Sequence, residues 1–368
     1  MRCCRMPSRR TILAALATLG GDGLSAAPAP SAPAADAALL RFPRDFGAHP
    51  EMRTEWWYVT GALAAGDRAW GFQITFFRAA TAVARAETSR FAARQLLFAH
   101  GAVTDLAARR LRHDQRIARS GFGIAEAALD DTALVLRDWR LARRGGSGAS
   151  RYAARATSDS AGFAYDLELA ATQPVLLQGE GGLSRKGPRP EQVSRYYSEP
   201  QLAVRGTLAV EGRSVDVTGR AWLDHEWSDA YLDPGAVGWD WIGMNLDDGS
   251  ALMAFRMRRA DGSTLWSGGS HRTAGGRARD FGDGEVVFVP GRTWISPASS
   301  ARYPVEWRIA TPVGSFAVRA LLDDQELDSR MSTGAIYWEG LSALLDAAGA
   351  AIGRGYLEMT GYAARLVL

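Results

Sequence analysis

The sequence has almost no cysteine. Of its 368 residues only Cys3 and Cys4 are cysteines, and both lie at the amino end. The remaining chain therefore has no disulfide, no thiolate nucleophile and no cysteine metal ligand. It also lacks a Gly-x-Ser-x-Gly elbow, a His-Glu-x-x-His zinc motif, a phosphate-binding loop and a dinucleotide glycine motif. These absences give no support for the common serine hydrolase, zinc peptidase and nucleotide-binding classes.

Lysine is almost as scarce, since Lys186 is the single lysine beside many arginines. Residues 1–35 contain four arginines and one aspartate, a net charge of +3 (4 − 1), and the whole chain has the same net charge of +3. The remainder is therefore close to neutral. It has no basic run with interleaved aromatics, so we expect no nucleic-acid partner.

No apolar run is long enough to span a bilayer, which takes about 20 residues. The longest near the amino end, Ile12 to Leu19, follows the paired arginines Arg9 and Arg10 and precedes an Ala/Pro/Ser stretch. This is the pattern of an export signal, and the paired arginines indicate the twin-arginine route. We expect residues 1–38 to be a cleaved signal peptide and linker, and the protein to be periplasmic or secreted.

The remaining sequence favours an all-β fold. Short runs rich in Val, Ile, Phe, Trp and Tyr alternate with Gly/Asp turns, and the helical signal is limited to residues 91–100 and 341–348. A chain of this length usually forms two domains. We expect an amino-terminal domain at residues 39–232 and a carboxy-terminal domain at residues 233–368, each an antiparallel β-barrel or sandwich.

An internal repeat supports two related halves. At an offset of 183 residues, the segment from Trp56 through Gly66 to Phe72 aligns with the segment from Trp239 through Gly249 to Phe255. Both copies predict a strand, a tight turn and a returning strand. In the returning strands, alternate residues form one apolar face, and its members are Trp70, Phe72, Ile74 and Phe76 in the first copy and Met253, Phe255 and Met257 in the second.

Chemistry-bearing residues gather in the middle of the chain, at 219–228 and 238–241. Within these segments lie four tryptophans, two aspartates, a histidine and a glutamate. A carboxyl beside large aromatics keeps its proton when burial raises its pKa, so Asp224 and Asp240 are candidate acids. The alternative is a structural corner in which these groups satisfy one another and fill the join between barrels.

Strand periodicity limits the options for Asp240. In the strand expected from Trp239 to Leu246, Asp240 shares a face with Ile242 and Met244, whereas Trp239 and Trp241 lie on the other. A carboxyl on an apolar face is protonated, paired with an arginine or histidine, or placed at a sheet edge. Only the first of these makes an obvious catalytic acid.

Several long motifs resemble one known family. They are Phe42 to Pro50, Thr54 to Gly61, Arg195 to Ser198, Trp222 to Trp227, Gly238 to Trp241 and Gly355 to Tyr362. In this order they resemble the AttH and carotenoid 1,2-hydratase family, over essentially the whole chain after the leader. The resemblance implies two tandem lipocalin-like, calycin-type β-barrels. It also implies addition of water to the terminal C=C of an acyclic carotenoid without a metal or organic cofactor.

Hydration of an unactivated alkene needs a strong acid, stabilisation of a carbocation and one positioned water. Asp224 and Asp240 are the candidate acids, and His225 or Tyr231 is a candidate to hold the water. Tryptophan faces stabilise a cation by about 0.5–2 kcal/mol each. The candidate substrate-binding residues are Trp222, Trp227, Trp239, Trp241, Trp56, Trp57 and Glu55. His100, His113 and His271 are isolated in the sequence and are expected to be ordinary surface or core residues.

The leading hypothesis is therefore a cofactor-independent hydratase acting on an isoprenoid or other apolar lipid, which it obtains by peripheral membrane contact. A non-catalytic carrier of an apolar ligand is the main alternative, and a secreted lipid hydrolase or isomerase is the second. The acidic residues near His225 lack a second histidine or cysteine nearby, so no metal site is expected.

Overall fold

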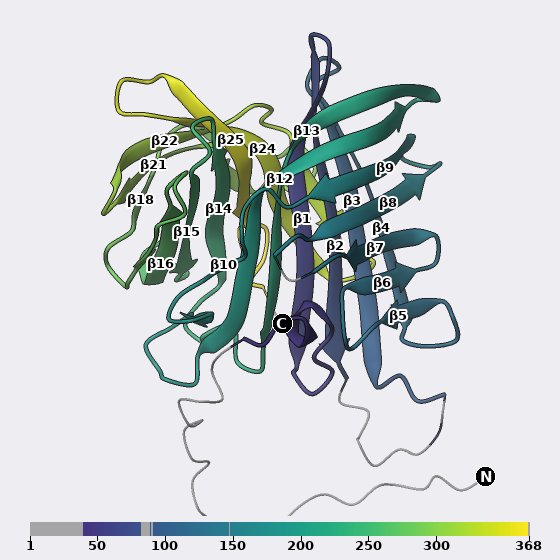
Figure 1. Ribbon diagram of the computed structural model, residues 1–368. Coiled ribbons are helices and arrows are strands. Elements are labelled where there is room, and N and C mark those ends of the chain that lie inside the picture. Colours follow the sequence, from purple (N-terminus) through teal and green to yellow (C-terminus); the bar gives the residue numbers. More distant parts are fainter. Residues whose placement is uncertain (1–39, 82–88, 90, 147, 367–368) are drawn as a thin grey trace, which may run out of the picture. The chain divides into compact units, whose positions relative to one another are not determined.

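The structure is a computed structural model that describes residues 40–81, 89, 91–146 and 148–366. The expected leader, residues 1–38, lies outside them. The described chain is built almost wholly from antiparallel strands (Figure 1), after a short 3-10 helix, η2 (Arg44–Phe46). No helix in this described part has the length and apolarity needed to cross a membrane.

The first sheet has thirteen strands in the order β4-β3-β2-β1-β13-β12-β9-β8-β7-β6-β5, with β10 and β11 also paired to β12. Strand β4 contacts β6, close to the opposite end of this order, so the sheet curls into a nearly closed barrel. Its strands are β1 (Thr54–Ala65), β2 (Arg68–Ala80), β3 (Gln95–Asp105), β4 (Arg110–Arg119), β5 (Ala125–Ala127), β6 (Ala133–Leu136), β7 (Trp139–Arg144), β8 (Arg151–Ser158), β9 (Phe163–Ala170), β10 (Leu176–Leu177), β11 (Leu183–Arg185), β12 (Val193–Val210) and β13 (Arg213–Ser228).

The second sheet has ten strands in the order β17-β16-β15-β14-β25-β24-β22-β21-β18, with β23 paired to β24, and a separate ribbon joins β19 to β20. These strands are β14 (Gly238–Leu246), β15 (Ala251–Arg258), β16 (Thr264–Arg272), β17 (Ala278–Phe281), β18 (Val287–Pro290), β19 (Thr293–Ile295), β20 (Arg302–Pro304), β21 (Glu306–Thr311), β22 (Gly314–Ala320), β23 (Glu326–Ser329), β24 (Ala335–Leu345) and β25 (Ala351–Met359). The expected domain boundary at residues 232 and 233 falls between β13 and β14, and a division into two independent domains stays a prediction.

Each sheet encloses its own apolar core, and a third cluster joins the two sheets. The first core includes Trp57 and Phe72, and the second includes Ile242 and Trp307. The third cluster is mostly aromatic and draws on both sheets, with Tyr58, Tyr196, Trp222, Trp241, Phe255 and Tyr356 among its members. A Cβ added at Gly71 on β2 would lie 2.6 Å from the hydroxyl of Tyr356 on β25, so the glycine permits this close approach.

The two predicted hairpins are confirmed. Strands β1 and β2 meet at Gly66, and β14 and β15 meet at Gly249, and both glycines have positive φ, 60° and 87°. The equivalent faces of the returning strands differ in environment. Phe72 packs inside the first core, whereas Phe255 packs in the cluster between the sheets. The equivalent apolar faces of β2 and β15 are therefore both buried, but the face of β2 packs in the core of its own sheet and the face of β15 packs in the cluster between the sheets.

The two helical expectations were wrong. Residues 95–105 form β3, and residues 335–345 form β24, which pairs with both β22 and β25. Leucine and alanine favour a helix in isolation, but every residue from Tyr337 to Ser342 is buried in the sheet. Tertiary packing outweighs the local helix propensity there.

Candidate active site

A cavity of about 250 Å³ is lined by side chains of both sheets. Most of its wall is apolar or aromatic, and it includes Trp56, Tyr231, Trp239 and Trp241. Five acidic side chains also reach it, namely Glu55, Asp224, Glu226, Glu339 and Glu358. An apolar cavity with a few convergent polar groups is the usual form of a small-molecule site.

Alternation along β13 decides which of its side chains reach the cavity. Asp224 and Glu226 line it, whereas Trp227 belongs to the core of the first sheet and His225 stacks on Trp57 of that core. Tyr58 lies directly opposite Asp224 in the pairing of β1 with β13. The sequence neighbours Asp224 and His225 therefore lie on opposite faces of one strand.

Asp224 is buried and accepts three hydrogen bonds. The hydroxyl of Tyr196 donates to Oδ2 at 2.8 Å, and Oδ1 accepts from the hydroxyl of Ser198 at 2.5 Å and from Nε1 of Trp222 at 2.7 Å. Burial raises the pKa of Asp224 to about 7, because it outweighs these hydrogen bonds, which lower the pKa. Oδ2 accepts a single hydrogen bond and keeps a lone pair for a proton, so this carboxyl exchanges a proton near neutral pH.

Glu226, two residues further along the same face, is paired with the single lysine of the chain. Lys186 Nζ lies 2.8 Å from Glu226 Oε1, which also accepts a hydrogen bond from the hydroxyl of Ser194. Burial raises the pKa of Glu226, and the charge of Lys186 acts in the opposite direction. The ammonium also lies 4.3 to 5.3 Å from three ring centroids, those of Tyr196, Tyr231 and Phe255.

The second sheet contributes a pair of carboxyls. Glu339 on β24 and Glu358 on β25 lie directly opposite each other, and both line the cavity. Burial, and then the proximity of Glu358, raises the pKa of Glu339 well above its usual range. Burial likewise raises the pKa of Glu358 to about 8. Burial therefore favours the protonated form of both groups.

Neutral polar groups lie in this wall or bond to it from outside the cavity. Gln73 Nε2 donates to Glu339 Oε2 at 2.9 Å, and His100 contacts the hydroxyls of Tyr337 and Ser332 at 2.7 and 2.9 Å. Burial lowers the pKa of His100 to about 3, so its imidazole is neutral. The expectation that His100 is an ordinary isolated residue was incomplete, because its side chain lines the cavity.

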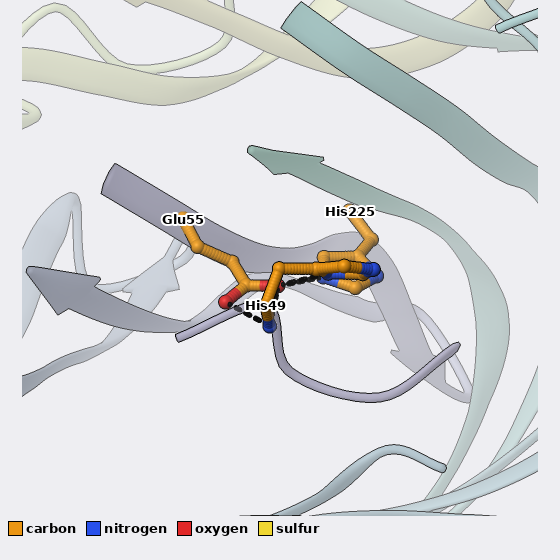
Figure 2. A group of neighbouring side chains, drawn as sticks. All are labelled: His49, Glu55 and His225. Atoms are coloured by element: carbon orange, nitrogen blue, oxygen red, sulfur yellow. Dashed lines mark hydrogen bonds and ion pairs between the residues drawn. The ribbon is translucent and has the colours of Figure 1, made fainter. Parts of the chain in front are cut away.

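Glu55 lies between two buried histidines, His49 and His225 (Figure 2), and also pairs with Arg78. Its Oε1 is 2.8 Å from His49 Nδ1 and 2.9 Å from His225 Nε2, and Arg78 Nε is 2.7 Å from Oε2. Burial alone would raise the pKa of Glu55, but hydrogen bonds from His225 and His49 and the charge of Arg78 hold the pKa far below its usual range. Glu55 is therefore a permanent carboxylate at the edge of the cavity.

Two tryptophans expected to bind substrate instead support this network. The ring of His49 stacks on Trp227 with centroids 3.8 Å apart, and His225 stacks on Trp57 with centroids 4.4 Å apart. Neither tryptophan lines the cavity. Both belong to the core of the first sheet.

His49, Glu55 and His225 are also the residue types that bind a transition metal. Their candidate ligand atoms lie within 4.8 Å of one another. The two nitrogen–oxygen distances of 2.8 and 2.9 Å are hydrogen-bond lengths. Ligands about 2.1 Å from a tetrahedral ion would stand about 3.4 Å apart. Because Arg78 already neutralises the carboxylate, this arrangement fits a proton network better than an ion.

The remaining predicted binding residues separate into two sets. Trp56, Trp239 and Trp241 line the cavity, and Tyr231 lies edge-on between Trp56 and Trp239 at centroid distances of 4.8 and 5.4 Å. Trp222 supports the site from behind through its hydrogen bond to Asp224 and does not line the cavity. The face predicted for Trp239 and Trp241 is thus the one that meets the cavity.

Asp240 lies away from the other predicted acid. Its carboxylate accepts hydrogen bonds from Arg256 Nε at 2.7 Å and from the hydroxyl of Tyr362 at 2.8 Å, with Arg258 Nε 3.8 Å away. It is fully buried and does not line the cavity. The sequence allowed Asp240 to be protonated, paired with an arginine or histidine, or placed at a sheet edge. The structure shows the second of these, a pairing with Arg256.

Sequence reasoning missed Glu339 and Glu358 as site residues. Glu358 lies within one of the recognised motifs, but nothing in the linear sequence indicates that it faces Glu339. A usable signal was present, because a lone glutamate within each of two apolar strand patterns predicts a buried carboxyl. Their meeting depends on strand register, which the sequence does not state.

The structure is therefore an all-β, lipocalin-like protein with an apolar cavity into which carboxyl groups reach. The family model described as AttH-like matches residues 33–362, and the chain belongs to that family. No curated protein matches the chain.

Solved structures agree with this assignment. A protein of Nitrosomonas europaea, provisionally named AttH, is 48% identical with a TM-score of 0.81, over 88% of this chain and 97% of that one. Kievitone hydratase from Nectria haematococca is 14% identical with a TM-score of 0.65, over 89% and 94% of the two chains. CghA in complex with Sch210972 is 10% identical with a TM-score of 0.50, over 85% and 89%. The last two similarities concern the fold alone.

Proposed function

We propose that this protein is a hydratase that adds water to a carbon–carbon double bond of an unsaturated isoprenoid or other apolar lipid. The observation that carries the proposal is Asp224, a carboxyl with a pKa of about 7 in an apolar cavity lined by tryptophans. Membership of the AttH-like family and the fold shared with kievitone hydratase support the reaction class.

The reaction needs a single acid–base group. Protonated Asp224 gives its proton to one alkene carbon, and the more substituted carbon becomes a cation. The faces of Trp239 and Trp241 stabilise that cation by about 0.5–2 kcal/mol each. Tyr231 positions a water, whose oxygen forms the new C–O bond. The water's proton returns to the Asp224 carboxylate, which restores the starting state.

The cavity size limits what it can enclose. Pockets for drug-sized ligands are roughly 300–1,000 Å³, and this cavity is about 250 Å³. It accordingly suits a short isoprenoid or one end of a longer chain. A full-length carotenoid would have to extend out of it.

The experiment is incubation of purified protein with alkene in heavy water, followed by mass spectrometry. The substrates are lycopene and citronellol, a ten-carbon isoprenoid alcohol with one trisubstituted alkene. We expect a product heavier by one heavy-water molecule, absent with Asp224→Asn and still formed by Asp240→Asn. Asp240→Asn must first be shown to be folded by circular dichroism, because it breaks a buried ion pair.

Other outcomes separate the alternatives. Recovery of bound but unchanged alkene would favour a non-catalytic carrier. A cleaved or isomerised product without added water would favour the lipid hydrolase or isomerase. Loss of product with Asp240→Asn but not with Asp224→Asn would reverse the assignment of the acid.

We also propose export by the twin-arginine route, with the ligand obtained by peripheral contact with a membrane. The basis is the Arg9-Arg10 pair before the apolar run from Ile12 to Leu19. Replacing both arginines with lysine should leave the protein in the cytoplasmic fraction with its leader uncleaved. Normal export of that variant would contradict the route.

A further inference from the structure

A row of apolar side chains leads from the cavity to the surface of the first sheet. Trp56 on β1 lies opposite Phe77 on β2, which lies opposite Phe98 on β3. Phe98 in turn lies opposite Ile117 on β4. Directly opposed residues of antiparallel strands project from the same face of the sheet, so these four side chains form one row. The first three line the cavity, whereas Ile117 is 40% exposed. The row therefore starts in the cavity and ends at the surface.

The turn between β23 and β24 flanks the same end of the cavity. Thr333 in this turn lines the cavity, and its neighbour Ser332 donates to Gln115 Oε1 on β4 at 2.6 Å. Gln115 shares a face of β4 with Ile117, because the two are two residues apart. Met331 in the same turn is 82% exposed. Met331 and Ile117 therefore both present apolar side chains to solvent beside the cavity.

An arginine and further apolar side chains continue this surface beyond Ile117. Arg119 shares the face of Ile117, and its guanidinium lies 4.3 Å from the ring centroid of Phe122. Phe122 and Ile124 follow β4 in the chain, and each is 46% exposed. The guanidinium of Arg119 donates to the carbonyl of Phe91 and forms no ion pair with a carboxylate of the described residues. Its charge can therefore meet an external anionic group.

These residues form a rim beside the cavity, made of Ile117, Arg119, Phe122, Ile124 and Met331. Large apolar side chains exposed singly are ordinary, but several gathered at one place mark an interaction surface. An aromatic ring and an arginine next to exposed aliphatic groups suit a membrane interface, where the apolar parts insert and the charge stays at the lipid phosphates. A bilayer also suits the row that leads inward, because a lipid that leaves the bilayer along it remains shielded from water.

We propose that the rim docks on the surface of a phospholipid bilayer, with its apolar side chains inserted and Arg119 bound to lipid phosphate. The row from Ile117 to Trp56 is then the route by which a lipid enters the cavity. The proposal rests on the proposed function for the nature of that lipid and deepens it by naming the membrane-contact surface. The docking itself needs no turnover.

The test is co-sedimentation of the purified protein with vesicles of phosphatidylcholine, made with and without phosphatidylglycerol. We expect binding to both kinds, and tighter binding to the vesicles that contain the anionic lipid. The double variant Ile117→Asp with Met331→Asp should bind about tenfold more weakly, because charges replace the inserted side chains. Arg119→Gln should lose about fivefold in affinity, mainly for the anionic vesicles.

The matched control is the double variant Val287→Asp with Val289→Asp. These valines lie on β18 of the second sheet, are 49% and 47% exposed, and do not line the cavity. The control should bind vesicles as the wild type does. Circular dichroism checks that each variant is folded. If the double variant of the rim fails to fold, Met331→Asp alone decides the question, because that side chain is the more exposed of the two.

The outcomes separate this proposal from the hydratase proposal. The docking surface is overturned if the wild type sediments with neither kind of vesicle, if the rim variant binds as the wild type does, or if the rim and control variants lose equal affinity. A dimer in sedimentation velocity that the rim variant loses, without vesicle binding, would assign the rim to a second copy of this chain instead. Heavy water incorporated by a protein that binds no vesicles refutes the docking alone, and vesicle binding without turnover refutes the hydratase alone.

Discussion

The ammonium of Lys186 lies 2.8 Å from Oε1 of Glu226, and both side chains are almost completely buried. Lysine otherwise does not occur in this chain, which uses arginine at all other basic positions. Arginine carries a planar fork of donors, whereas lysine carries a compact charge. The compact ammonium fits among three aromatic rings while it bonds one carboxylate. The pairing with Glu226 therefore holds the ammonium of Lys186 next to the cavity.

Lys186→Met should destabilise the protein by about 3–5 kcal/mol, because it leaves the buried Glu226 without its cation. The double variant Lys186→Met with Glu226→Gln should recover most of that loss, since no unpaired charge remains. The measurement is urea unfolding at neutral pH. For the exposed pair Arg205 and Glu168, Arg205→Met should change the stability far less than Lys186→Met does, because solvent screens that pair. A double variant as unstable as Lys186→Met would show that packing, and not charge, is responsible.

Lys186 should also resist acylation in the native protein. Its side chain is 2% exposed, so an amine-reactive reagent cannot reach Nζ unless the site opens. Peptide mapping after treatment with an acetylating ester should find Lys186 unmodified in buffer and modified in concentrated urea. Because the chain has no other lysine, modification there is read without ambiguity. Fast labelling of the native protein would contradict the buried position.

Much of the fold could be predicted from particular sequence features. The turns at Gly66 and Gly249 have the glycine that positive φ favours, and alternation of apolar residues gave the correct faces of β2 and β14. The same alternation already implied that Asp224 and His225 point in opposite directions. Grouping them as one catalytic set ignored that rule, and the structure separates them onto the cavity and the core.

The rest of the site depends on long-range pairing. Glu55 bonds His225 across 170 residues, and Gln73 bonds Glu339 across 266 residues. These contacts follow from the order and register of strands, which a single sequence does not specify. The same holds for Asp240. Strand alternation predicted that it lies on an apolar face, but not that Arg256 is its hydrogen-bond partner.

Divalent metal should leave the stability of the protein unchanged. Glu55 already bonds two histidines and pairs with Arg78, so an ion would have to displace these hydrogen bonds and lie close to a guanidinium. We expect the melting temperature to be the same in EDTA as in equimolar zinc, measured by calorimetry. A rise of several degrees with zinc that His49→Asn abolishes would identify a metal site instead.

Asp224→Asn should change how stability depends on pH. Burial raises the pKa of Asp224 from 3.8 to about 7, so between these values the folded protein holds a proton that the unfolded chain releases. The stability of the wild type therefore loses a contribution as pH rises through this window, about 4 kcal/mol in total. Asparagine does not titrate, so the variant lacks this pH-dependent contribution. Its unfolding free energy therefore increases relative to that of the wild type as pH rises.

The measurement is the difference in unfolding free energy between Asp224→Asn and the wild type, by urea titration at pH 4.5 and pH 7.5. Taking the difference cancels the contributions of titrating groups that do not interact with Asp224. Glu226 and Glu358 do interact with it, so their titration contributes to the difference. The exposed Asp261 is the control, because its hydrogen bond with Ser263 lowers its pKa and the difference for Asp261→Asn should not rise in this window. Parallel stability curves for Asp224→Asn and the wild type would mean that Asp224 is ionised throughout. It would then have no proton to give an alkene at neutral pH.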